Sequence, residues 1–282
     1  MVPTPLFAMT FGVLTGLAGP AAIAVPSATA GTCAADSVPG AVAANAASLA
    51  TLAWAPFGRA ETGWAVYAPR IAREIETPCD VATPGFAAAL GRWQGRHRLS
   101  PTGVFDPLTF VAMKARWQGA RPFVHIDGRT ACPPPPSPDR LATAGGRESF
   151  AGKTIQLRAH ALAAYRAMLG AARHDPALRA EPRSLTIFSG FRDPAADAAR
   201  CTVDGNCNGV VRATCSAHRT GLALDLWVGN AAGYGPDSSA DRNRLAMVAG
   251  PQYRWLLANA ARFGFVNYVF EPWHWEWTGE PI

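Results

Sequence analysis

Two short polar motifs near the C-terminus constrain this 282-residue sequence more than any other feature. The first contains His218 and Asp225, and the second contains Glu271 and His274. Two histidines and one aspartate can hold a zinc ion and leave one coordination position open, as catalytic zinc sites do. Glu271 is then free to act as a base toward water, whose pKa a bound zinc lowers to about 7. The C-terminal half is therefore predicted to carry a catalytic zinc centre.

The residues around both motifs are typical of strands. Residues 221–228 form a mostly apolar run, in which an aspartate is costly unless a cation or strong donors satisfy it. Residues 264–277 are rich in Phe, Val, Tyr and Trp and predict a second extended stretch. Pro272 indicates an edge or a bulge in it. Such a break could turn Glu271 and His274 toward one pocket, although a regular pleat would point them apart.

The two motifs together read SxHxxGxAxD, from Ser216 to Asp225, and ExWHW, from Glu271. This pattern resembles the zinc D-alanyl-D-alanine carboxypeptidases of the VanY type, which share a structural group with lysostaphin and the sonic hedgehog signalling domain. The resemblance runs from about residue 157 to residue 277. It implies that Zn²⁺ is the cofactor, that Glu271 is the general base, and that the metal ligands are His218, Asp225 and His274.

The resemblance also implies substrate contacts. The SGFR segment that ends at Arg192 is similar to the SGYR segment of the family, so Arg192 would stabilise the oxyanion or orient the substrate. Donors positioned in this way are typically worth about 3 kcal/mol of the barrier. Ser216 would help to bind the peptide backbone. Apart from the resemblance, Trp273, Trp275 and Trp277 alternate along the predicted strand, so they could line a substrate groove, with core packing and edge cover as the alternatives. Glu276 is a second candidate base, but the family pattern favours Glu271.

Among the departures from the family pattern, two lie between Arg192 and Ser216. The family often has a glutamine shortly after SGYR, whereas this chain has residues 193–197, which read DPAAD. Residues 199–215 contain three cysteines and resemble an insertion. Both departures concern the substrate preference more than the metal site.

The N-terminal half contains a second motif. Residues 83–118 carry apolar side chains at helical spacing on either side of a turn, residues 102–107, which read TGVFDP. This stretch resembles the peptidoglycan-binding domain of bacterial wall hydrolases, which implies that it binds the cell wall. The alternative is a helical hairpin that only packs against the enzyme.

The N-terminus and the cysteines indicate export. Residues 6–25 are almost wholly apolar and residues 28–30 offer an A-x-A cleavage site, so residues 1–30 are predicted to be a signal peptide, with an uncleaved anchor as the alternative. No other segment is long and apolar enough to cross a bilayer. Six cysteines in an exported chain favour disulfides, including a local bridge among Cys201, Cys207 and Cys215. The expected location is periplasmic or extracellular.

The charge pattern bears on the partners. The formal net charge is +6, but the arginines are scattered and form no stripe of the kind that binds nucleic acid. A modest positive field would suit an acidic polymer or a substrate that ends in a carboxylate, and a solvated basic surface is an equal alternative.

The predicted fold class is α+β, a small antiparallel sheet with flanking helices that carries a zinc site, preceded by a small helical domain. Helices are expected over residues 155–172 and 253–263, and a strand over residues 185–188. The predicted segments are a signal peptide (1–30), a linker or first helix (31–60), a helical peptidoglycan-binding-like domain (61–125), a Pro-rich linker (126–150) and a zinc peptidase domain (151–282).

The resulting prediction is a secreted zinc metallopeptidase that acts on peptidoglycan stem peptides, foremost as a D-alanyl-D-alanine carboxypeptidase. Two alternatives stay open. One is an endopeptidase that cuts within the stem or cross-bridge. The other is a non-catalytic wall-binding protein with a structural zinc.

Overall fold

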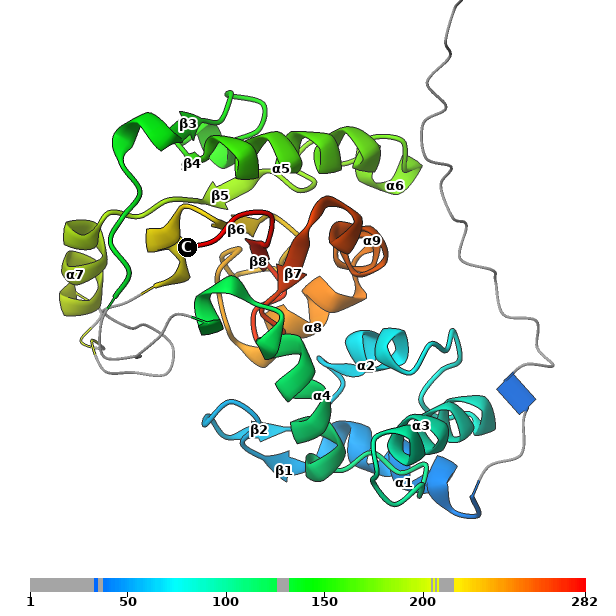
Figure 1. The fold of residues 1–282 in the computed structure, drawn as a ribbon. Helices are drawn as coiled ribbons and strands as arrows, with labels where there is room; N and C mark the ends of the chain where they lie inside the picture. The colour runs from blue at the N-terminus through cyan, green and yellow to red at the C-terminus, as the bar shows by residue number, and fades with distance from the viewer. Residues whose placement is uncertain (1–32, 35–37, 126–131, 204, 206, 208–215) are drawn as a thin grey trace, which may run out of the picture.

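A computed structural model describes residues 33–34, 38–125, 132–203, 205, 207 and 216–282 (Figure 1). The predicted signal peptide and part of the predicted Pro-rich linker lie outside these residues. Among the described residues, no helix combines the length and the apolar character that a bilayer span requires.

Four antiparallel strands form the sheet at the centre of the C-terminal half, in the order β5-β6-β8-β7. In this sheet Asp225 lies directly opposite His274 on the neighbouring strand, so residues far apart in the sequence meet. The strands are β5 (Ile187–Ser189), β6 (Ala223–Leu226), β7 (Phe265–Asn267) and β8 (His274–Trp277). The predicted α+β class with a small antiparallel sheet is confirmed.

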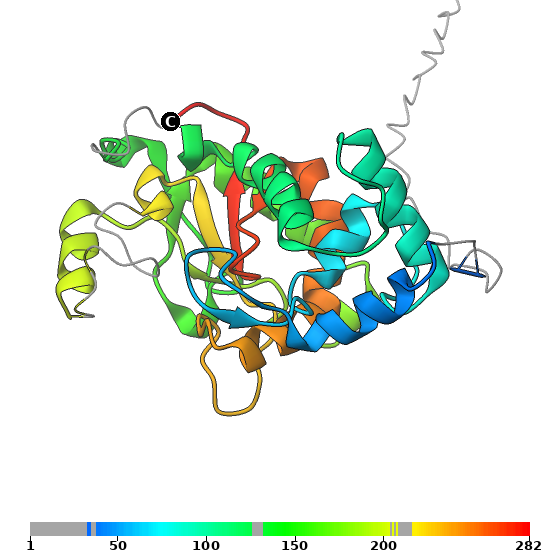
Figure 2. The same cartoon turned by 90° about the horizontal axis from the view of Figure 1, so that it is seen from below.

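Helices surround this sheet and form most of the N-terminal half. In both views, α1–α4 gather at one end of the molecule beside α8 and α9, and α7 lies at the other end (Figures 1 and 2). The helices are α1 (Ala41–Thr51), α2 (Ala68–Glu74), α3 (Pro84–Arg96), α4 (Pro107–Gly119), α5 (Ala159–Ala172), α6 (Pro176–Arg179), α7 (Pro194–Val203), α8 (Asp241–Ala249) and α9 (Pro251–Asn259). Short two-stranded sheets pair β1 (Ala53–Trp54) with β2 (Glu61–Thr62), and β3 (Leu141–Thr143) with β4 (Gln156–Arg158).

Several sequence predictions differ from the structure at their boundaries. The strand expected over residues 185–188 is β5 (Ile187–Ser189), and the helix expected over residues 253–263 is α9 (Pro251–Asn259) followed by the short helix η6 (Ala260–Phe263). The helix predicted from residue 155 begins at Ala159, because Gln156–Arg158 pair with β3 instead. The stretch predicted over residues 264–277 is a hairpin, β7 and β8, rather than one strand. Pro272 lies in the connection between the two strands, where its missing N–H costs no ladder hydrogen bond.

The TGVFDP turn is held by contacts within the N-terminal half. Gly103 has a left-handed φ of 68°, and a Cβ there would lie 2.7 Å from the carbonyl oxygen of Ala87, so this position requires glycine. Its backbone N–H donates to Gln94 Oε1 at 2.9 Å, and its carbonyl oxygen accepts from Asn45 Nδ2 at 2.8 Å. Asp106 caps α4 by accepting from the backbone N–H of Thr109 at 2.7 Å. These contacts give the motif a folding role, and its wall-binding role stays a prediction.

Two disulfides link described cysteines, Cys33 with Cys79 and Cys201 with Cys207. The second is the local bridge that the sequence predicts. Both bridges suit a protein that folds in an oxidising compartment.

The two halves share one buried hydrophobic cluster, which extends from Trp64 to Trp275. A buried ion pair crosses between them as well. Arg244 of α8, which is fully buried, donates to Glu61 at 3.1 Å and to the hydroxyl of Tyr67 at 2.7 Å. Removal of one partner from a buried ion pair leaves an uncompensated charge in the core. The packing of the halves therefore depends on this contact.

We expect Arg244→Met to destabilise the chain, because Glu61 would lose its cationic partner inside the core. The expected loss in the free energy of unfolding is about 3–5 kcal/mol, measured by urea denaturation followed by tryptophan fluorescence. Arg140→Met is the control, because the half-exposed Arg140 pairs with Glu280, which keeps Arg158 as a second cationic partner, and its unfolding midpoint should match that of the wild type. An unchanged unfolding midpoint for Arg244→Met would contradict a stabilising role for the ion pair between Arg244 and Glu61.

Candidate metal centre

Three elements bring His218, Asp225 and His274 together. Asp225 comes from β6 and His274 from the first position of β8, opposite it. His218 comes from the short helix η5 (Ala217–Thr220), which precedes β6. Ser216 caps η5, because its hydroxyl accepts from the backbone N–H of His218 at 3.2 Å. Gly221 ends η5 with a left-handed φ of 71° and turns the chain into β6.

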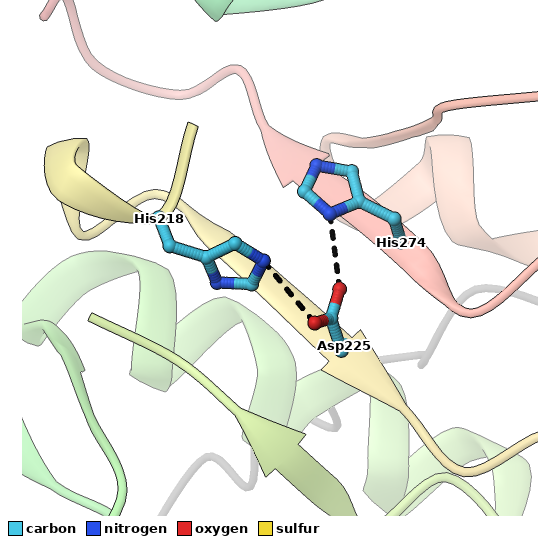
Figure 3. A group of neighbouring side chains, drawn as sticks. All are labelled: His218, Asp225 and His274. Carbon is cyan, nitrogen blue, oxygen red and sulfur yellow. Dashed lines mark hydrogen bonds and ion pairs between the residues drawn. The ribbon is translucent and has the colours of Figure 1, made fainter. Parts of the chain in front are cut away.

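The side chains of these three residues converge on one point (Figure 3). His218 Nε2 lies 3.2 Å from Asp225 Oδ2, and His274 Nδ1 lies 3.0 Å from Asp225 Oδ1. One ligand atom from each residue lies within 4.8 Å of the other two, and all three residues are buried. The geometry therefore unites the three predicted metal ligands.

Hydrogen bonds on the far side of each imidazole fix which nitrogen carries the proton. His218 Nδ1 lies 2.8 Å from the carbonyl oxygen of Gly190, which can only accept, so Nδ1 donates. His274 Nε2 lies 3.3 Å from Oε1 of Glu276, so Nε2 donates to this carboxylate. In the neutral rings, the lone pairs of His218 Nε2 and His274 Nδ1 therefore face the Asp225 carboxylate.

Two lone pairs and a carboxylate in such proximity repel one another, so the cluster requires a positive charge. A proton can supply it. Burial opposes a charged His274, yet hydrogen bonds to Asp225 and Glu276 raise the pKa of His274 to about 9. Burial likewise opposes ionisation of Asp225, but His218 and His274 outweigh it and lower the pKa of this carboxyl. A divalent cation meets the same requirement, and two imidazole nitrogens with one carboxylate oxygen form a donor set that suits zinc.

Glu271 and Glu276 lie on opposite sides of the His274 ring. Glu271 Oε2 is 3.9 Å from Nδ1, on the side of the candidate metal ligands, and the Glu271 side chain is 19% exposed. The Glu276 side chain is 1% exposed and lies against Nε2. Burial opposes its ionisation, but His274 and Arg121 lower the pKa of Glu276 to about 2. Glu271 is therefore the more exposed of the two carboxylates and the one on the side of the candidate metal ligands.

Arg192 and Ser216 lie next to each other beside His218. The backbone N–H of Arg192 donates to the carbonyl oxygen of His218 at 3.2 Å, and its guanidinium reaches Ser216 Oγ at 3.5 Å. The guanidinium also donates to Ser189 Oγ at 3.2 Å and to the buried carboxylate of Asp197 at 3.1 Å. Asp197 belongs to the DPAAD segment, where the sequence departs from the VanY-type pattern, and it orients Arg192 in this chain.

Trp273 is 3% exposed and belongs to the hydrophobic core cluster. Trp275 is equally buried and alternates along β8 with His274 and Glu276. Its indole N–H donates to the carbonyl oxygen of Pro272 at 3.1 Å. These tryptophans therefore support the strand from the core, and a substrate contact by Trp273 stays a prediction.

The residues behind the imidazoles, Gly190 and Glu276, were not identified as partners of the histidines from the sequence. A signal for Glu276 was present, because residues two apart on a strand share a face and His274 precedes it by two. The close approach of Gly190 could not be foreseen. A Cβ at this position would lie 2.5 Å from the carbonyl oxygen of Gln156, so only glycine lets the chain pass here.

No family model matches this chain, and a search of curated proteins finds no match. Among solved structures, five chains match. One is the LdcB LD-carboxypeptidase, described for its recognition of peptidoglycan, with 22% identity over 50% of this chain and 69% of that chain and a TM-score of 0.38. Another is a mutant of the vancomycin-resistance D,D-pentapeptidase VanY in complex with Zn(II), with 20% identity over 52% of this chain and 83% of that chain and a TM-score of 0.30.

About half of the chain is thus similar to these two structures, and the chain holds a buried His-Asp-His triad. The chemistry available at the centre follows from its own side chains.

We expect the purified wild-type protein to bind one equivalent of zinc, and His218→Ala to lose it, because the variant removes one of three protein ligands. Elemental analysis after dialysis measures the ratio of metal to protein. His160→Ala is the matched control, since the His160 side chain is 81% exposed and pairs with Glu280, away from the triad. Zinc retained in full by His218→Ala would exclude His218 as a ligand.

Proposed function

We propose that this protein is an exported zinc peptidase that hydrolyses the peptide stem of peptidoglycan, and that it removes the terminal D-alanine from a D-Ala-D-Ala end. One observation carries the proposal: the buried His218–Asp225–His274 cluster with Glu271 on its open side. The proposal of a cell-wall substrate is based on the resemblance of the SxHxxGxAxD and ExWHW motifs to those of the VanY-type carboxypeptidases. Export is supported by the disulfides, which persist in oxidising compartments.

The three ligands would hold Zn²⁺ with one position open. A zinc ion held there would supply Lewis-acid chemistry, polarising the scissile carbonyl and lowering the pKa of water toward neutral pH. The protein fixes the geometry for this chemistry, because both outward nitrogens are already protonated and hydrogen-bonded. The rings therefore do not need to reorient when the ion binds.

Glu271 acts as the general base and then as the general acid. Its carboxylate takes a proton from the attacking water and delivers it to the nitrogen of the leaving amine, so that the amide C–N bond breaks as the amine leaves neutral. The hairpin connection holds this residue in place, since its backbone N–H donates to the carbonyl oxygen of Tyr268 at 2.8 Å. Its carbonyl oxygen accepts from Asn267 Nδ2 at 3.1 Å.

Arg192 supplies hydrogen-bond donors on the other side of His218. Asp197 and Ser189 orient the guanidinium, so that it presents a positive charge without a further conformational change. A charge placed in this way stabilises the negative charge that develops on the carbonyl oxygen of the substrate. Ser216, within reach of Arg192, is the proposed contact for the peptide backbone of the substrate.

We expect Glu271→Gln to keep its zinc and to lose activity by about 10²–10⁴-fold, because the amide cannot carry the proton. Release of D-alanine from a defined stem pentapeptide, assayed with equal metal loading, measures this loss. Glu181→Gln, which changes a carboxylate in the exposed pair with Arg183, is the control and should retain full activity. Turnover by Glu271→Gln within a few-fold of the wild type would refute the assignment of Glu271 as the general base.

Mass spectrometry of digested muropeptides identifies the bond that is cut. A carboxypeptidase shortens the stem by one D-alanine, and we expect this product, lost on addition of a chelator and restored by zinc. Release of a larger fragment would instead identify an endopeptidase. Binding to sacculi without release of any amine would contradict a catalytic role and favour a wall-binding protein with a structural zinc.

A further inference from the structure

The carboxylate behind His274 is held by a segment from the N-terminal half of the chain. Arg121 lies between α4 and the short helix η2 (Pro122–His125), which packs against β8. Its Nε donates to Glu276 Oε1 at 2.7 Å, and its Nη2 lies 2.5 Å from the same oxygen. The backbone N–H of Phe123 donates to the second oxygen, Oε2, at 3.1 Å. Both oxygens of Glu276 are thus fixed by residues more than 150 positions away in the sequence.

Arg121 is itself held on two sides. Its Nη1 donates to Gln118 Oε1 at 2.6 Å, and its guanidinium lies 4.2 Å from the centre of the Tyr268 ring. The Tyr268 ring in turn contacts the His274 ring edge-on, with their centres 6.0 Å apart. The side chain of Arg121 is only 10% exposed. An arginine fixed in this way presents its nitrogens to the carboxylate in one geometry.

These contacts bear directly on the metal centre. Glu276 Oε1 accepts the proton of His274 Nε2, which leaves Nδ1 as the nitrogen that can bind a metal. Carboxylates that hold the second nitrogen of a ligating histidine fix the tautomer and the orientation of the ring, and their loss typically weakens metal binding by about 10–100-fold. Arg121 acts one step further out, because it keeps this carboxylate in place.

We propose that Arg121 is a positioning residue of the metal centre, acting through Glu276 on His274, so that the N-terminal half completes the site that the C-terminal half carries. The proposal rests on the proposed function in that the triad must bind a divalent metal. On this proposal, the contact of Arg121 with Glu276 supports the metal centre and does not serve only to pack the two halves together.

Zinc affinity of the full chain tests this proposal without substrate. Competition with a chromophoric chelator gives the dissociation constant for the wild type, Arg121→Met, Glu276→Gln and the double variant. We expect each single variant to weaken zinc binding by about 10–100-fold. Because Arg121 acts through Glu276, the double variant should be no weaker than the weaker single variant, within about twofold.

Arg59→Gln is the matched control. Arg59 donates to the carbonyl oxygen of Ser239 at 2.9 Å and pairs with Asp241 at 3.4 Å, so it joins the same two halves without touching Glu276. Its zinc affinity should stay within about twofold of the wild type. An equal loss of affinity in Arg59→Gln would show that general packing is responsible and would overturn the proposal.

Wild-type affinity in Arg121→Met, or losses that multiply in the double variant, would also overturn it. Near-UV circular dichroism of the metal-free proteins checks that each variant folds. If Arg121→Met does not fold, Arg121→Lys keeps the charge but lacks the two-nitrogen contact, and a measurable loss of zinc affinity is again expected.

The two proposals fail in different ways. A wild-type protein that binds zinc but cleaves no stem peptide contradicts the proposed function and leaves the zinc comparison intact. A wild-type protein that cleaves stem peptides, with an Arg121→Met variant of equal zinc affinity, contradicts only the role of Arg121.

Discussion

The contact of the Asp225 carboxylate with the imidazoles of His218 and His274 is the interaction on which the candidate metal centre depends. Each ring donates its outer proton to a fixed acceptor, so the inner nitrogen of each ring faces the carboxylate, with a lone pair there when the ring is neutral. Such an arrangement is stable only around a positive charge. The centre therefore combines burial, which raises the cost of any unpaired charge, with a geometry that a divalent cation satisfies directly.

The fold places these groups from several directions. The β6–β8 pairing sets Asp225 opposite His274, and the close passage of the chain at Gly190 brings its carbonyl oxygen to His218. The β7–β8 connection presents Glu271 on the side of the candidate metal ligands. The N-terminal half approaches from behind through Arg121, while Arg244 ties the halves together inside the core. The candidate centre thus belongs to both halves of the chain.

Much of this could be predicted from the sequence, because the key groups lie in short motifs. The residue types in the two motifs predict a zinc centre, the family that they resemble implies the roles of His218, Asp225, Glu271 and His274, and the apolar runs predict the strands that carry them. The β7–β8 hairpin does not follow from the sequence, because Pro272 in an aromatic run indicates an edge or a bulge as readily as a reversal of the chain. The pairing of Glu276 with Arg121 was beyond reach, since no local pattern links residues in different halves of a chain.

X-ray absorption at the zinc edge of the zinc-loaded protein tests the central claim most directly. The account predicts a first shell of nitrogen and oxygen only, at about 2.0–2.1 Å, with outer-shell scattering from two imidazoles. A sulfur shell at about 2.3 Å, or scattering from fewer than two imidazoles, would contradict it, because the metal would then lie outside the cluster of His218, Asp225 and His274.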